Sequence, residues 1–155
     1  RAMINNIIDA ATNAPTACNR LPYRFIVITD KSKVQEVSKL AGGTNGWREQ
    51  IPGLIVVLGD LSNFENSYDR HLIYTDSSYA VMQFCLLSLT AGIGTCIINW
   101  HDNIYRDAKL RKIISIAQYE KPICMVAFGY PSEQVTVPYS EKKELSEIAR
   151  FIEKN

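Results

Sequence analysis

The chain has 155 residues, of which 46% are hydrophobic and 21% are charged. This length is enough for one domain with a proper core and too short for two comfortable ones. Lys and Arg total 17 and Asp and Glu total 16, so the formal net charge is +1. That balance gives no electrostatic reason to expect nucleic acid or an anionic membrane as a partner. We therefore expect one domain over residues 1–155.

The cysteines and histidines do not form a metal-binding pattern. The chain has four cysteines and two histidines, and no two cysteines form a Cys-x-x-Cys pair, so a zinc site is not expected. Its opening residues do not have the pattern of a signal peptide, so we do not expect one there. Its longest apolar stretch, residues 79–91, is shorter than the ~20 residues that a membrane span needs. We expect a reduced, cytoplasmic protein.

The first elements alternate between helical and strand patterns. Apolar residues at helical spacing predict a helix over residues 3–14. Residues 23–29 are rich in β-branched and aromatic side chains and predict a strand. A short amphipathic helix follows over residues 30–40, and either Asp30 or Ser32 is suited to cap its first turn.

The middle of the chain is its most apolar part. Residues 54–59 form a continuous apolar run, which is typical of a strand covered on both faces. A helix is predicted over residues 77–91, capped by Thr75 or Asp76 and ended by Gly92. This helix is apolar nearly all round, so we expect it to lie centrally in the domain or against a partner.

The last third continues the alternation. A strand over residues 94–100, a basic amphipathic helix over 105–114 and a strand over 122–129 are predicted. An extended segment over residues 135–139 then leads to a closing helix over 142–153. Interleaved helices and strands indicate an α/β or α+β protein with helices packed on a sheet.

Three segments carry a resemblance to a known family. They are residues 14–25 (Ala-Pro-Thr-Ala-Cys-Asn-Arg-Leu-Pro-Tyr-Arg-Phe), 91–98 (Ala-Gly-Ile-Gly-Thr-Cys-Ile-Ile) and 127–131 (Ala-Phe-Gly-Tyr-Pro). In this order and at this spacing they resemble the nitroreductase-like FMN enzymes over nearly the whole chain. The resemblance implies an α+β fold with a central sheet of about four or five strands and helices on both faces. It also implies a symmetric homodimer with the flavin between two subunits.

The resemblance also implies where FMN would be held. The residues that it places at the cofactor are Pro15, Thr16, Ala17, Asn19, Asn45, Arg48, Ile97, Ile98, Asn99, Trp100 and Lys142. The turn at residues 15–19 would meet the flavin, often across the dimer interface. Arg48 would place positive charge near N1 of the ring, and Lys142, where the family usually has Arg, would reach the phosphate. Backbone groups of residues 97–100 would bond beside the ring.

Each of these positions also has an ordinary structural interpretation. The turn is equally a helix stop with an Asx-type turn. Arg48 and Lys142 are equally solvated side chains, and Trp100 equally fills the core. The resemblance further implies a basic segment before the first helix that clamps the phosphate. Since the chain begins at Arg1, we expect that segment to be missing from it.

Residues 63–74 resemble the mobile segment that covers the substrate in related enzymes. The side chains that would line it are Phe64, Tyr68, Arg70, His71 and Tyr74. A lid selects its substrate by shape and charge. These aromatic side chains could equally pack locally.

No catalytic acid, base or nucleophile motif stands out, which fits chemistry carried by a cofactor. The resemblance therefore implies that NAD(P)H reduces FMN and that an electron-poor small molecule, such as a nitroaromatic or a quinone, takes the electrons. Two alternatives stay open: a flavin-binding protein without this turnover, and a degenerate member that binds no flavin.

Overall fold

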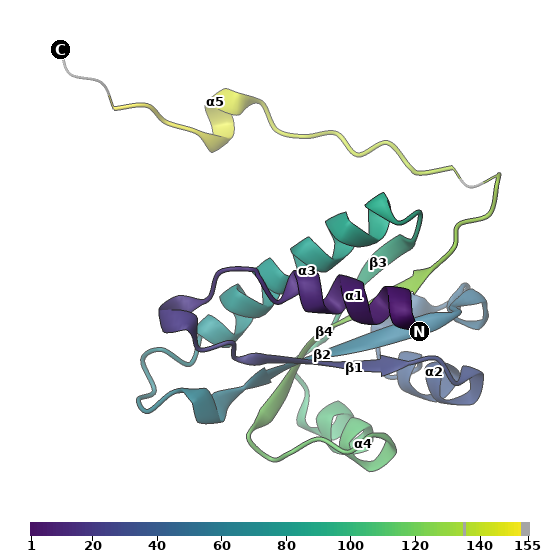
Figure 1. Ribbon diagram of the computed structural model, residues 1–155, viewed down its shortest axis with the longest axis horizontal. Coiled ribbons are helices and arrows are strands. Elements are labelled where there is room, and N and C mark those ends of the chain that lie inside the picture. Colours follow the sequence, from purple (N-terminus) through teal and green to yellow (C-terminus); the bar gives the residue numbers. More distant parts are fainter. Residues whose placement is uncertain (135, 153–155) are drawn as a thin grey trace.

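The computed structural model describes residues 1–134 and 136–152, and within them four strands form one sheet in the order β1-β2-β4-β3. Every neighbouring pair is antiparallel. The strands are β1 (Tyr23–Ile28), β2 (Gly53–Asp60), β3 (Gly94–Asn99) and β4 (Glu120–Gly129). The helices are α1 (Ala2–Ala11), α2 (Lys31–Ser38), α3 (Leu72–Thr90), α4 (Ile104–Ile113) and α5 (Leu145–Ile148). Figure 1 shows α1 and α3 on one side of the sheet and α2 and α4 on the other, which confirms the α+β prediction.

The two central strands are buried on both faces. Successive side chains of a strand point to opposite faces. Leu54, Val56 and Leu58 of β2 accordingly join the core beneath α2 and α4, whereas Ile55 and Val57 join the core beneath α1 and α3. The continuous apolar run of β2 is therefore covered on both faces, as its sequence predicts.

Two of the predicted helix ends are confirmed by their capping geometry. The side chain of Asp30, not Ser32, caps α2, because its Oδ1 accepts a hydrogen bond from the Lys33 amide at 2.8 Å. At the end of α3, Gly92 adopts a φ of 71°. The amide of Ile93 then donates to the Ser88 carbonyl at 2.9 Å. This is the Schellman arrangement, which favours glycine because it needs a left-handed residue.

Helix α3 begins earlier than the sequence predicts. It starts at Leu72 rather than near residue 77, and His71, not Thr75 or Asp76, occupies its N-cap position. The carboxylate of Asp76 instead accepts a hydrogen bond from the Ala17 amide at 3.1 Å. A polar residue near a helix start resembles a cap in the sequence, and only the tertiary contact distinguishes the two roles.

The closing helix is much shorter than predicted. Within the described residues only Leu145–Ile148 are helical, and Val135 and Glu153 lie outside them. The tail leaves the sheet after β4 and runs apart from it (Figure 1). Leu145 and Ile148 are exposed, so this helix lacks the packed apolar face that stabilises short helices.

The outer surface of α3 remains apolar in the single chain. It presents a row of large exposed side chains, Tyr79, Met82, Leu86 and Leu89. Their spacing places them on one side of the helix. Within residues 1–134 and 136–152, no helix combines the length and apolar character that crossing a bilayer requires.

The core beneath α2 and α4 predicts a large stability difference between two changes of similar volume. Leu54 is fully buried, whereas Ile104 at the start of α4 is 74% exposed. We expect Leu54→Ala to lower the free energy of unfolding by about 2–5 kcal/mol, because it leaves a cavity. Ile104→Ala should change it by less than ~0.5 kcal/mol. Urea unfolding measures both values, and equal losses would contradict the assigned core.

The cysteines should differ strongly in reactivity. Burial, together with the neighbouring Cys85, raises the pKa of Cys124 to about 12, whereas Cys18 is exposed. The reactive species is the thiolate. At pH 8 we therefore expect iodoacetamide to modify Cys18 roughly a thousandfold faster than Cys124 in the folded chain. Peptide mass spectrometry over time measures both rates, and similar rates would mean that Cys124 is open to solvent.

Candidate functional site

The turn between α1 and β1 has an unusual backbone. Three residues that are not glycine have positive φ values of 54°, 53° and 47°: Cys18, Asn19 and Leu21. Such residues rarely adopt this conformation unless their surroundings fix it. Here the hydroxyl of Thr16 accepts from the Leu21 amide at 3.2 Å, and Asp76 accepts from the Ala17 amide at 3.1 Å. Two hydrogen bonds therefore hold the turn of residues 15–19, which the resemblance places at the flavin. One comes from Thr16 within the turn and the other from Asp76 of α3.

Arg20 joins this turn to the predicted lid. Its guanidinium lies 5.4 Å from the centre of the Phe64 ring, within cation–π range, and 3.7 Å from the Asp69 carboxylate. Its carbonyl accepts from the Asn63 side chain at 3.4 Å. Tyr68 is 85% exposed, but Phe64 is only 4% exposed. Phe64 thus anchors the segment, rather than lining an open lid surface.

A cleft of about 480 Å³ lies between α3 and the strands β3 and β4. Its lining residues are Tyr74, Ser78, Val81, Met82, Ile97, Asn99, Ile123 and Cys124. The structure therefore brings the predicted lid residue Tyr74, which lies within α3, together with the predicted cofactor residues Ile97 and Asn99. Among the described residues β3 pairs with β4 alone, so its outer edge offers backbone donors and acceptors to a ligand.

The other two residues of that strand segment point away from the cleft. Ile98 and Trp100 are buried in the core beneath α2 and α4, and the Trp100 indole donates to the Asp107 carboxylate at 2.8 Å. Alternation along a strand explains this split. The side chains of Ile97 and Asn99 can therefore contact a ligand in the cleft. Ile98 and Trp100 can contact it only through their backbone.

Asn45 and Arg48 lie together in the turn that precedes β2. The Arg48 guanidinium donates to the Asn45 side chain at 2.7 Å, and the Gln35 side chain donates to the Arg48 carbonyl at 2.8 Å. A Cβ added at Gly43 would lie 3.8 Å from the side chain of the core residue Ile98. The turn that carries Arg48 is therefore held against α2 through Gln35, and Gly43, which precedes it, lies against β3.

An ion pair that the sequence did not indicate lies near the cleft residue Tyr74. The Lys121 ammonium lies 2.9 Å from the Asp102 carboxylate. This hydrogen bond is the main cause that raises the pKa of Lys121, to which the neighbouring Tyr74 also contributes. Lys121 is therefore positively charged at neutral pH. Neither residue belongs to a local motif, so only the pairing of distant segments reveals them.

One chain does not bring all predicted residues together. Tyr23 pairs with Gly59 at one end of the sheet and Ile28 with Leu54 at the other. The turn before β1 thus lies at the first end, and the turn that carries Arg48, which precedes β2, lies at the second (Figure 1). Lys142 is further away on the tail, where its ammonium donates to the Ser140 hydroxyl at 2.7 Å.

Comparison with known proteins places these observations in a family. The model of the Nitroreductase family matches residues 34–130. A protein of Archaeoglobus fulgidus that carries the provisional name NADH dehydrogenase/NAD(P)H nitroreductase is 28% identical over 131 residues, which cover 84% of this chain and 74% of the relative. Mouse iodotyrosine deiodinase 1 is 25% identical over 172 residues, and the match covers 94% of this chain but 60% of the deiodinase.

Solved structures show the same fold. An FMN-dependent nitroreductase of Clostridium difficile R20291 superimposes with a TM-score of 0.79 at 22% sequence identity, covering 97% of this chain and 87% of that one. The family model spans well over half of the chain, and the arrangement of helices about the four-stranded antiparallel sheet agrees with it. The chain belongs to the nitroreductase family.

Proposed function

We propose that the protein is an FMN-dependent oxidoreductase that passes electrons from NAD(P)H to an electron-poor small molecule, such as a nitroaromatic or a quinone. The family match over residues 34–130 carries this proposal. It is supported by relatives named NAD(P)H nitroreductase and, in Bacillus subtilis, FMN reductase. Bound FMN would supply the electron-transfer chemistry, and the protein would supply binding, orientation and charge.

The residues at the edge of the sheet fit a flavin. Apolar side chains, among them Val81 and Ile123, line the cleft together with residues of the edge strand β3. Ring-shaped ligands bind to such apolar surfaces, and a few polar groups fix their orientation. Asn99 and the outer edge of β3 would provide those groups, and Arg48 would stabilise negative charge on the ring system. We assign the rim residue Tyr74 to the acceptor side of the cleft.

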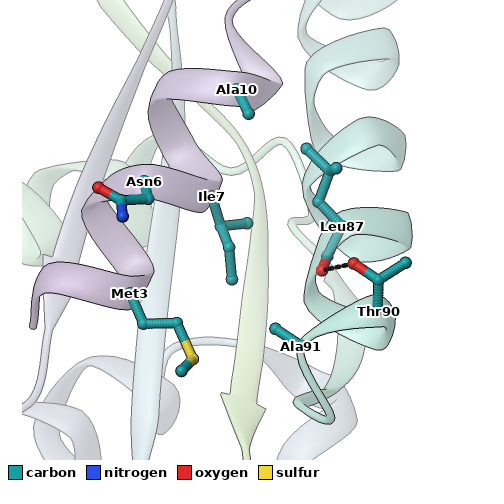
Figure 2. A pocket seen from close by; sticks show the side chains of 7 residues that line it. All are labelled: Met3, Asn6, Ile7, Ala10, Leu87, Thr90 and Ala91. Atoms are coloured by element: carbon teal, nitrogen blue, oxygen red, sulfur yellow. Dashed lines mark hydrogen bonds between the residues drawn. The ribbon is translucent and has the colours of Figure 1, made fainter.

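We further propose that the protein works as a homodimer. Tyr79, Met82 and Leu86 of the exposed row line one groove together with Leu87. Leu87 also lines a second groove, of about 460 Å³, between α3 and α1. Figure 2 shows Met3 and Ile7 of α1 beside Leu87 and Ala91 of α3 in this groove. A continuous apolar surface of this kind is typical of a subunit interface. A two-fold axis would also let the turn of residues 15–19 from one chain approach the cleft of the other. The cytoplasmic setting stays a prediction from cysteine usage.

The cofactor proposal predicts a visible spectrum. We expect the purified chain, after addition of FMN and gel filtration, to retain flavin absorption that bleaches under nitrogen when NADH or NADPH is added. Bands that persist with both nucleotides would favour the alternative of a flavin-binding protein without this turnover. A chain that retains no flavin would contradict the cofactor proposal and favour a degenerate family member.

The dimer proposal predicts that one charge on α3 separates the subunits. Leu86 is 53% exposed in the single chain, and Leu86→Glu would bury a carboxylate without a partner in the interface. We expect the dimer dissociation constant to rise at least roughly a hundredfold, since such burial costs about 3 kcal/mol. Sedimentation velocity over a concentration series measures it.

A control for this change lies on the other side of the sheet. Tyr105 of α4 is 74% exposed, and Tyr105→Glu introduces the same charge away from α1 and α3. This variant should sediment like the unaltered chain. If both variants remain dimeric, the interface lies elsewhere.

A further inference from the structure

Asp76 is a buried carboxylate and the one charged residue of the helix α3. Asp76 is 2% exposed. A carboxylate that is buried to this extent needs a hydrogen-bond partner to offset its lost hydration. The Ala17 amide, far away in the sequence, donates to its Oδ2 at 3.1 Å. The charge of Asp76 also adds to the effect of burial in raising the pKa of Tyr23. The carboxylate therefore lies between the turn before β1 and the start of that strand.

The turn that Asp76 holds depends on an outside anchor. Ala17 is followed directly by Cys18 and Asn19, which both have left-handed backbones. The surroundings must keep these residues in this conformation, because it is unfavourable for side chains other than glycine. The hydroxyl of Thr16 stabilises the turn from within. Of the Thr16 hydroxyl and the Asp76 carboxylate, only the carboxylate connects the turn to the long helix α3.

We propose that Asp76 is a positioning residue, which holds the turn of residues 15–19 in the shape that meets the flavin by accepting the Ala17 amide. That Asp76 holds the turn follows from the contacts described above. That the turn thereby binds the flavin rests on the proposed function. A neutral oxygen at the same place would serve, because an amide donor needs an acceptor and not a full charge. The role thus differs from that of a charged group acting on the flavin itself.

The test compares Asp76→Ala with Asp76→Asn, which retains an oxygen at the same position. Quenching of FMN fluorescence measures the dissociation constant, and hydrogen exchange measures protection of the amides at residues 16–21. We expect Asp76→Ala to raise the FMN dissociation constant about tenfold and to remove the protection of the Ala17 amide. Asp76→Asn should stay within roughly twofold of the unaltered chain in both measurements.

Ser77→Ala is the matched control. Ser77 neighbours Asp76 on α3 and is fully buried, and its hydroxyl oxygen has no hydrogen-bond partner within the described residues. This variant should leave both FMN binding and exchange unchanged. A similar loss in Ser77→Ala would show a general effect of disturbing α3 and would overturn the proposal. Asp76→Asn binding as weakly as Asp76→Ala would also overturn it, because charge would then be the property used.

Two results separate this inference from the proposed function. If the unaltered chain binds no FMN, the function fails, but exchange at Ala17 still tests the anchor. If the Ala17 amide of the unaltered chain exchanges as fast as an unprotected amide, the anchor is absent, whether or not FMN binds. The latter measurement requires no variant, so it remains decisive even where Asp76→Ala does not fold.

Discussion

The antiparallel pairing of β2 with β4 is the constraint on which the rest of the structure depends. Both strands are buried on both faces, so their backbone hydrogen bonds form where water cannot compete. This pairing fixes β1 and β3 as the two edges of the sheet. It also fixes which side chains face each helix layer, because a slip of one residue would exchange the two faces. The register of β3 on β4 in turn places the side chains of Ile97 and Asn99 at the cleft and that of Ile98 in the core.

The pairing of β1 with β2 explains why the candidate site is divided within one chain. The turn before β1 and the turn before β2 lie at opposite ends of β1, a separation of roughly 17 Å for a strand of this length. Side-chain movements do not close such a gap. The core residues of β1 and β2 would have to move to bring these turns together. A second copy of the chain can supply the missing half without any such rearrangement, and this links the proposed dimer to the proposed cofactor site.

The sequence predicts those features that local physics determines. All four strands lie where β-branched and apolar runs indicate, because such side chains pack well on the pleated surface of a sheet. The Asp30 cap and the Gly92 stop are predictable because each acts on the backbone within a few residues of itself. The predicted length of the closing helix was wrong, because its apolar residues have helical spacing but Leu145 and Ile148 are exposed and do not pack on the sheet.

Site residues are harder to predict, because their roles depend on contacts between distant segments. The resemblance proposed Ile97 and Asn99 together with their neighbours, but it did not tell which side chains face the cleft. The buried carboxylate of Asp76 illustrates a more general ambiguity. An acidic residue near the start of an apolar helix predicts a cap, and here the helix begins earlier, so the same side chain is free to hold another segment.

Helix α3 is apolar both on the side that faces the core and on the side that faces outward. A helix that covers a core on one side and meets water on the other is amphipathic. Here the inner side contributes Ile73, Val81 and Phe84 to the buried core, whereas the outer row is equally apolar and exposed. Asp76 departs from this pattern on the inner side, where the turn of residues 15–19 meets the helix. A partner on the outer row would therefore bury the rest of the apolar surface and simultaneously fix the helix that positions this turn, so that assembly and cofactor binding would depend on the same element.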